Sequence, residues 1–168
     1  KFPLILTQVA IGIGVGLSSS IPSYNLIELA NAMVKYIETG EKTLLYPDFA
    51  TGGYISNNVE AAQQIAETGM GAVKLRGKAE IIGNEIEITE IPYSTTREAI
   101  IEKIIELAKT DKLKEIIDIK DLTGLHGQLI EIRCRKNVDM QNVLNKLYKF
   151  TPLEGNFNAN MNMLIDDL

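Results

Sequence analysis

Apolar residues recur at helical spacing in four stretches of the chain, and each stretch opens with a side chain that can cap a helix. Helices are predicted to begin at Asn25, near Asn57, at Thr95 and at Asp139. The first two should end at Gly40 and Gly69, because glycine readily adopts the left-handed conformation that closes a helix. The pattern therefore predicts four amphipathic helices.

Alternating and continuous apolar runs between these helices predict strands. Ala72–Ile82 and Glu85–Ile91 flank Gly83-Asn84, a two-residue turn typical of a β-hairpin. Ile116–Ile119 and Gln128–Arg135 flank a polar loop at 121–127. From residue 72 the predicted order is ββαββαβ, which indicates an α/β (α+β) fold: a mostly antiparallel sheet with helices packed on one face.

Two domains are predicted. Residues 1–68 would form a smaller module of helices and strand with a glycine-rich segment, and residues 69–168 the α/β module. The boundary is placed in the glycine-containing stretch Thr68-Gly69-Met70-Gly71, where the chain is most easily bent.

The most unusual stretch is Gly12-Ile13-Gly14-Val15-Gly16. It lacks the G-x-G-x-x-G spacing of a dinucleotide-binding turn and the Gly-Lys-Ser/Thr of a P-loop, so a nucleotide site is disfavoured. We interpret residues 3–17 as buried structure and this stretch as a buried glycine-rich strand. Glycines in a strand also let another backbone, or DNA, approach closely.

Lys74, Arg76 and Lys78 alternate in the predicted strand 72–82, which places their side chains on one face. A row of cations suits a phosphate backbone. The alternative is a solvated sheet face on which Glu85 and Glu87 balance the cations across the hairpin.

The amino-acid composition indicates the class of protein to which the chain belongs. The chain has 168 residues, 45% apolar and 23% charged, which is typical of a globular protein. No run of about 18 apolar residues is present, so no membrane-spanning helix is expected. The net charge of −5 argues mildly against nucleic acid as a partner.

One cysteine and one histidine exclude an internal disulfide and disfavour a zinc cluster, so a cytoplasmic protein without a metal is expected. Cys134 is predicted to be a buried packing thiol and His126 an exposed loop residue. Tyr36 and Tyr148 lie on helix stripes, which predicts that they pack.

Several segments, in order along the whole chain, resemble the A subunit of bacterial type IIA topoisomerases, that is, gyrase and topoisomerase IV. Residues 1–6 are similar to the family's K-F-P-x-L-L, residues 12–16 to G-I-A-V-G and residues 21–26 to I-P-P/S-H-N-L. Residues 46–53 resemble G-P-D-F-P-T-G-G, residues 68–71 T-G-R-G, and residues 144–151 L-N-N-L-Y-K-x-T. The chain departs from these motifs at Gly14, Tyr24, Ala50 and Met70.

The resemblance implies an α/β fold and a place at the end of the DNA-gate region and in the tower domain. It also implies that Ile13, between Gly12 and Gly14, wedges between base pairs and bends DNA, and that Lys74, Arg76 and Lys78 track phosphates. The parent enzyme would be an ATP-dependent topoisomerase that cleaves, passes and reseals duplex DNA.

The resemblance places the parent's catalytic tyrosine upstream of this chain, since none of the six tyrosines matches its motif. No catalytic residue or cofactor is therefore expected in this fragment, which should be inactive alone. Mg²⁺ and ATP would act through the B subunit. The implied partners are double-stranded DNA, a second A subunit together with the B subunit, and no membrane.

Two other readings stay open. The acidic charge favours a structural or protein-interaction module with no DNA role, in which Ile13 would be a core residue. The other alternative is a small-molecule enzyme that uses the glycine-rich loop.

Overall fold

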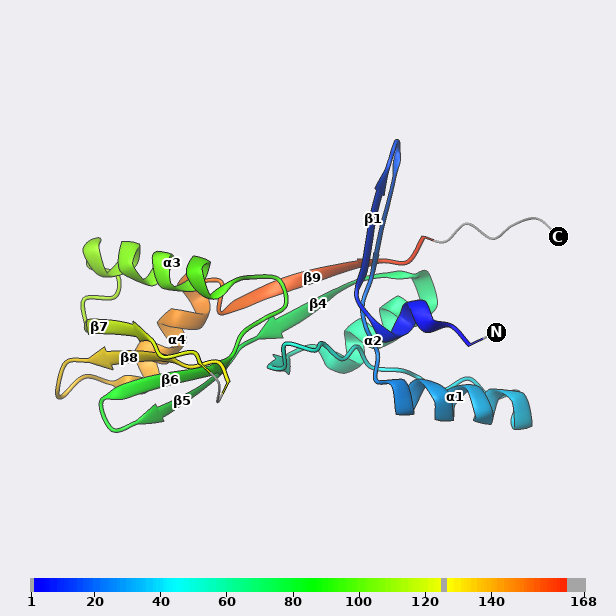
Figure 1. The fold of residues 1–168 in the computed structure, drawn as a ribbon, viewed down its shortest axis with the longest axis horizontal. Helices are drawn as coiled ribbons and strands as arrows, with labels where there is room; N and C mark the ends of the chain where they lie inside the picture. Colours follow the sequence, from blue (N-terminus) through cyan, green and yellow to red (C-terminus); the bar gives the residue numbers. More distant parts are fainter. Residues whose placement is uncertain (1, 125–126, 163–168) are drawn as a thin grey trace. The chain divides into compact units, whose positions relative to one another are not determined.

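A computed structural model describes residues 2–124 and 127–162 of the chain. The helices are η1 (Leu4–Thr7), α1 (Leu26–Thr39), α2 (Asn58–Thr68), α3 (Arg97–Lys109) and α4 (Met140–Phe150). The strands are β1 (Ala10–Gly14), β2 (Leu17–Ile21), β3 (Tyr54–Ile55), β4 (Met70–Arg76), β5 (Lys78–Ile82), β6 (Glu85–Glu90), β7 (Ile116–Asp121), β8 (Ile130–Cys134) and β9 (Glu154–Asn160). Figure 1 follows them along the chain.

The strands form two sheets, with the orders β1-β2-β9-β4-β3 and β5-β6-β8-β7. The chain divides into two compact units. Unit 1 comprises residues 1–50, 55–74 and 156–168, and unit 2 comprises residues 51–54 and 75–155. This partition by compactness differs from the predicted ranges 1–68 and 69–168, because the chain passes between the units more than once.

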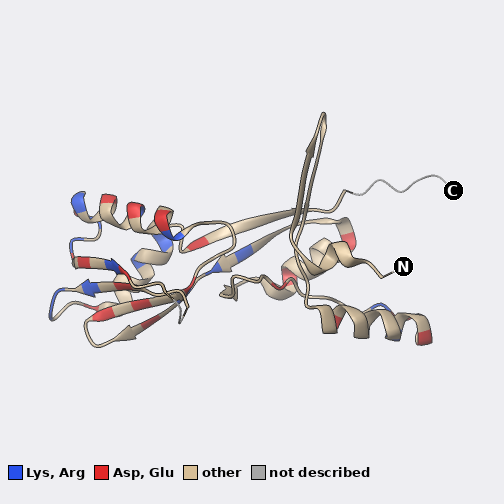
Figure 2. Ribbon diagram, viewed as in Figure 1, with Lys and Arg blue, Asp and Glu red and all other residues tan. Residues whose placement is uncertain are grey.

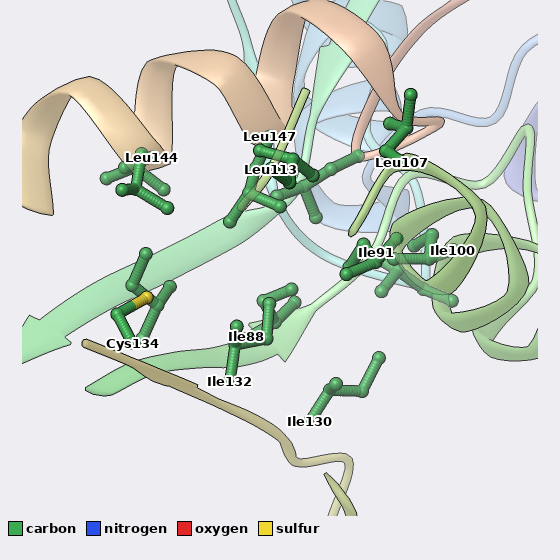
Figure 3. Close-up of a cluster of buried hydrophobic side chains, with 14 residues drawn as sticks. Ile88, Ile91, Ile100, Leu107, Leu113, Ile130, Ile132, Cys134, Leu144 and Leu147 are labelled. Atoms are coloured by element: carbon green, nitrogen blue, oxygen red, sulfur yellow. The ribbon is translucent and has the colours of Figure 1, made fainter. Parts of the chain in front are cut away.

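The predicted α+β fold is confirmed, and unit 2 shows how its sheet and helices pack together. On one face of the four-stranded sheet, Ile86, Ile88, Ile130 and Ile132 are buried against α3 and α4. Figure 3 labels Ile88, Ile130 and Ile132 of the strands together with Leu107 and Leu147 of the two helices. The other face carries charged residues, among them Glu85 paired with Arg133 at 2.9 Å. Strand alternation thus separates an apolar core from a solvated face.

Two of the four predicted caps act as expected, whereas the Asn57 side chain is hydrogen-bonded to β4 and does not cap α2. The Asn25 side chain accepts hydrogen bonds from the backbone amides of Ile27 and Glu28, and that of Asp139 accepts one from Asn142. Helix α3 begins one residue later than predicted, because Thr96 and not Thr95 caps it. Gly40 and Gly69 end α1 and α2 in the left-handed conformation, as predicted.

The single strand predicted for residues 72–82 is wrong, whereas the order ββαββαβ is that of β5 to β9, with β4 as an additional strand before it. Gly77 separates β4 from β5, and the two strands belong to different sheets. A Cβ on Gly77 would lie 2.6 Å from Leu153 Cδ1 and 2.7 Å from the Glu90 carbonyl, so only glycine fits. The predicted hairpin is confirmed, because β5 and β6 pair around Gly83-Asn84 with Ile82 opposite Glu85.

Two predictions about packing residues have different outcomes. Cys134 is a buried free thiol, as predicted, and burial raises its pKa to about 11. Tyr148 is half-buried and packs, but Tyr36 is exposed, so its predicted packing role is wrong. Of the apolar stripe of α1, only Leu29 is buried. His126 lies outside the described residues.

Candidate nucleic-acid interface

The glycine-rich stretch forms one arm of a β-hairpin in unit 1. Strands β1 and β2 pair from Ala10 opposite Ile21 to Gly14 opposite Leu17, and Val15-Gly16 forms the turn. Gly16 has a φ of 79°, in the left-handed region where glycine is favoured. In Figure 1 the two strands run together as a narrow ribbon that rises from the rest of unit 1.

The hairpin is exposed, so the prediction of buried structure in residues 3–17 is wrong. Ile13 is 89% exposed, and Ile11, Val15 and Leu17 are also exposed. The reason is topological: β1 is the edge strand of its sheet, and the tip extends beyond β9, which pairs with β2 only at Ser20 opposite Asn160. The same exposure contradicts the expectation that Ile13 is a core residue of this chain.

The two glycines beside Ile13 are not required by packing within the described chain. A Cβ on Gly12 would have no heavy atom within 4 Å, and one on Gly14 would lie 3.6 Å from the Leu17 carbonyl, an ordinary contact. Neither has a positive φ. Their missing side chains leave a flat strand on which Ile13 is the one projecting group between them, a surface that another molecule can approach closely.

Hydrogen bonds hold strand β2 of the hairpin to Asn160 and Asn162. The side-chain amides of Asn160 and Asn162 both donate to the Ser18 carbonyl, at 3.1 and 2.9 Å, and the Ser19 hydroxyl donates to the Asn160 carbonyl at 3.3 Å. Ile21, at the foot of β2, is buried. The hairpin is thus anchored along β2 as far as Ser18, the residue opposite Ile13.

An open hollow of about 750 Å³ lies along the hairpin, lined by residues between Gly12 and Ser19 together with Met161 and Asn162. The hollow is therefore lined both by exposed apolar side chains and by the amide of Asn162. Contiguous exposed apolar surface on a protein commonly marks an interaction site.

The three cations of the predicted row do not share one strand. Lys74 and Arg76 lie on β4, where the intervening Val73 and Leu75 are buried on the opposite face, as predicted. Lys78 opens β5, beyond the break at Gly77. Lys74 is exposed, whereas Arg76 and Lys78 are partly buried.

Arg76 is engaged within unit 2. Its guanidinium forms an ion pair with Glu154, with a hydrogen bond of 2.6 Å from Nε, and lies 4.5 Å from the centre of the Tyr148 ring. The Tyr148 hydroxyl donates to the Gly77 carbonyl at 3.0 Å. The expectation that Glu85 and Glu87 balance this cation is wrong: Glu154 does so, and Glu85 pairs with Arg133.

The tyrosines of the described chain that show shifted pKa values are poor nucleophiles. Burial raises the pKa of Tyr24, and it raises that of Tyr148 in spite of the nearby Arg76. A phenol with a raised pKa is still less ionised at neutral pH than a free one. Among the described residues no three His, Cys, Asp or Glu side chains gather as they would around a metal ion.

Sequence reasoning singled out Gly12, Ile13 and Gly14, and the structure brings them together on one exposed strand. It missed the exposed apolar neighbours Ile11, Val15 and Leu17, and the anchoring Asn160 and Asn162. Ile11, Ile13 and Val15 alternate with glycines, a pattern that is the same for a strand buried by its own chain and for one awaiting a partner.

Comparison with known proteins gives consistent matches over the whole chain. The family of DNA gyrase/topoisomerase IV A subunits matches residues 1–168. The chain is 37% identical to the chloroplastic/mitochondrial DNA gyrase A subunit of Arabidopsis thaliana over 175 residues, which cover 96% of this chain and 18% of that protein.

Bacterial relatives match as well. Identity to the DNA gyrase A subunit of Lawsonia intracellularis is 35% over 179 residues, covering 99% of this chain and 22% of the relative. For the same protein of Rickettsia typhi the corresponding values are 37%, 99% and 20%. The chain therefore spans about a fifth of the length of these relatives. In the part of the chain that the structure describes, no helix has the length and apolar character needed to cross a bilayer.

Proposed function

The chain belongs to the family of DNA gyrase/topoisomerase IV A subunits, and from this membership we propose that it is a DNA-binding and DNA-bending part of the A subunit of a type IIA topoisomerase. The observation that carries the proposal is the exposed, anchored hairpin with Ile13 between two glycines. The chain's partner is then duplex DNA.

The physical argument begins with the energy of bending. Partial unstacking of one base step costs a few kcal/mol, and proteins that kink DNA offset this cost by inserting an apolar side chain between the bases. Ile13 is apolar, exposed and flanked by residues without side chains. Insertion would remove this side chain from water while the glycines let the strand backbone approach the groove.

The anchoring of β2 is the second support. A wedge can bend DNA only if the force on it is transmitted to the protein. The bonds from Asn160 and Asn162 to Ser18 join the hairpin to β9 and to the segment that follows it. These contacts restrict movement of the hairpin relative to β9 when DNA is pressed against it.

The proposed phosphate contacts are still Lys74, Arg76 and Lys78, but we expect their contributions to DNA affinity to differ. Arg76 is held by Glu154 and Tyr148, so a phosphate would have to compete with an existing ion pair. Lys74 lies on an exposed strand face. We therefore expect Lys74 and Lys78 to contribute more to DNA affinity than Arg76.

In the parent enzyme we propose cleavage and resealing of duplex DNA with Mg²⁺ and ATP supplied through the B subunit, in a complex that contains two A subunits. The chain alone cleaves nothing under this proposal, because none of its tyrosines matches the cleaving motif. A cytoplasmic location belongs to the same proposal.

Binding of duplex DNA tests the proposal. The anisotropy of a labelled duplex should rise on addition of the chain at about 50 mM salt, and the binding should be largely lost at about 0.5 M salt, because phosphate contacts release counterions. The absence of binding at the lower salt concentration would overturn the proposal and favour a structural or protein-interaction module.

A further inference from the structure

A second cationic surface, separate from the row at residues 74–78, lies at the C-terminal end of α4. Phe150 closes this helix and is 37% exposed. Two ammonium groups approach its ring: Lys149 Nζ at 5.4 Å and Lys112 Nζ at 5.7 Å from the ring centre. Lys112 comes from the loop between α3 and β7, so two segments distant in sequence deliver cations to one aromatic ring.

The loop that carries Lys112 is held in place. Leu113 is fully buried, and its amide donates to the Leu107 carbonyl at 3.2 Å. Lys112 and Lys114, on either side of it, are exposed. We call the surface formed by Lys112, Lys114, Lys146, Lys149 and Phe150 the Phe150 patch; Figure 2 shows the blue segments of the loop and of α4 that contribute to it.

Carboxylates near the patch neutralise only part of its charge. Lys146 donates to Glu115 at 2.5 Å, and this hydrogen bond is the main reason that the pKa of Glu115 is lowered. Asp111 is the other acidic residue of the loop, and α4 has none. Among the residues that the structure describes, Lys112 and Lys149 form no ion pair. Residues 110–115 and α4 thus carry four lysines and two acidic residues, in a chain whose net charge is −5.

The helix dipole accounts for only one of the ring's two cations. A lysine in the last turn of a helix is stabilised by the negative end of the dipole, and Lys149 occupies that position in α4. This effect does not explain why Lys112 reaches the same ring from a different segment. Two like charges brought together without a carboxylate between them point to an anionic ligand.

We propose that the Phe150 patch binds the phosphate backbone of duplex DNA, an inference that rests on the proposed function. The two ammonium groups lie no more than about 11 Å apart, and a duplex carries one negative charge per about 1.7 Å of its axis, so both can contact one stretch of backbone. The contact with the ring orients each lysine but leaves its three N–H donors for phosphate oxygens.

An acidic protein surface is the competing ligand, and composition favours DNA. Lysine is depleted from protein–protein interfaces, whereas lysine contacts to phosphate are a major part of protein–DNA interfaces. The patch has one exposed aromatic side chain and several lysines, which fits backbone contact and not a desolvated protein interface.

The test compares two variants of the full chain that lose the same charge. K112Q/K149Q removes both cations from the ring, and K35Q/K103Q removes two lysines that are paired with Glu41 and Glu106 elsewhere. Anisotropy of a labelled duplex is measured across a salt series. For K112Q/K149Q, the slope of log affinity against log salt should become shallower by about 1.8, the value for two lost phosphate contacts. For K35Q/K103Q the slope should stay that of the original chain.

Equal slopes for the two variants would overturn the patch assignment while leaving the proposed function in place, provided that the original chain binds the duplex. No binding by any of the three proteins would overturn the proposed function itself. Polyglutamate serves as the probe for a protein ligand. Competition by polyglutamate as effective as that by unlabelled duplex, at equal charge, would overturn the assignment of DNA as the ligand.

Discussion

The side-chain amide of Asn160 donates a hydrogen bond of 3.1 Å to the carbonyl of Ser18, across 142 positions of the chain. Asn162 donates to the same oxygen at 2.9 Å. The carbonyl thus accepts from two amides, and Ser18 lies directly opposite Ile13 in the hairpin. This junction turns an isolated two-stranded ribbon, which would be only marginally stable by itself, into a supported one.

Removal of both amides should loosen the hairpin without unfolding the chain. For N160A/N162A we expect DNA bending to weaken and the free energy of unfolding to fall by about 1–2 kcal/mol, the usual net value of two exposed hydrogen bonds. Chemical denaturation and energy transfer across a doubly labelled duplex measure the two effects. N158A, a substitution of an exposed asparagine of the same strand, is the control. Undiminished bending by N160A/N162A would contradict the supporting role.

Gly12 and Gly16 of the hairpin should respond differently to alanine. Gly12 has free space around it and an ordinary φ, so G12A should not destabilise the fold and should disturb only DNA binding. Gly16 has a φ of 79°, so G16A should cost about 1–2 kcal/mol. Thermal denaturation and duplex anisotropy distinguish them. Normal DNA affinity in G12A would refute close approach of a backbone at this strand.

We expect Arg76 to contribute mainly to the stability of the fold and Lys78 mainly to DNA binding. R76A removes the ion pair with Glu154 and the contact with Tyr148, so we expect it to lower the melting temperature more than K78A does. K78A should weaken duplex binding more. The two variants carry the same charge change, so each is the other's control, and the reverse order in both measurements would refute this division of roles.

The raised pKa of Cys134 predicts a loss of stability at high pH. The thiol of the folded chain titrates at about 11, above its ordinary value of 9.0, so between these values only the unfolded chain releases the proton. The free energy of unfolding should therefore fall as pH rises through this range, by at most about 1.4 kcal/mol per pH unit.

C134V, which keeps an apolar side chain of similar size at this buried position, removes the titrating group and should show a shallower decline. Denaturant titrations at several pH values measure both proteins. Identical pH profiles for C134V and the original chain would show that the thiol does not titrate in this way.

Local features of the fold were predictable from the sequence where one residue type determines a local geometry. Asn25 and Asp139 cap helices as predicted, and Gly40 ends α1. The break at Gly77 was not predictable, because apolar and polar residues alternate smoothly through it. The residues that leave no room for a side chain at Gly77, Leu153 and Glu90, are brought there by the tertiary fold.

The candidate site was predictable in its residues but not in its exposure. A strand such as Gly12-Ile13-Gly14 has the same pattern whether its own chain or another molecule covers it, so the sequence favoured burial, and the structure exposes it. The partners of Arg76 could not be predicted either, since Glu154 and Tyr148 are brought to it by the tertiary fold.

The bend angle of duplex DNA bound to the complete A subunit tests the central claim most directly. We compare I13A with I37A, which shortens a similarly exposed isoleucine, 78% exposed, on α1. Both should leave the free energy of unfolding within about 0.5 kcal/mol of the original, since both side chains face solvent. Energy transfer between the duplex ends should report a smaller bend angle for I13A than for the original protein, and an unchanged angle for I37A. A bend angle for I13A equal to that of the original would contradict the wedge, and with it the role assigned to the hairpin.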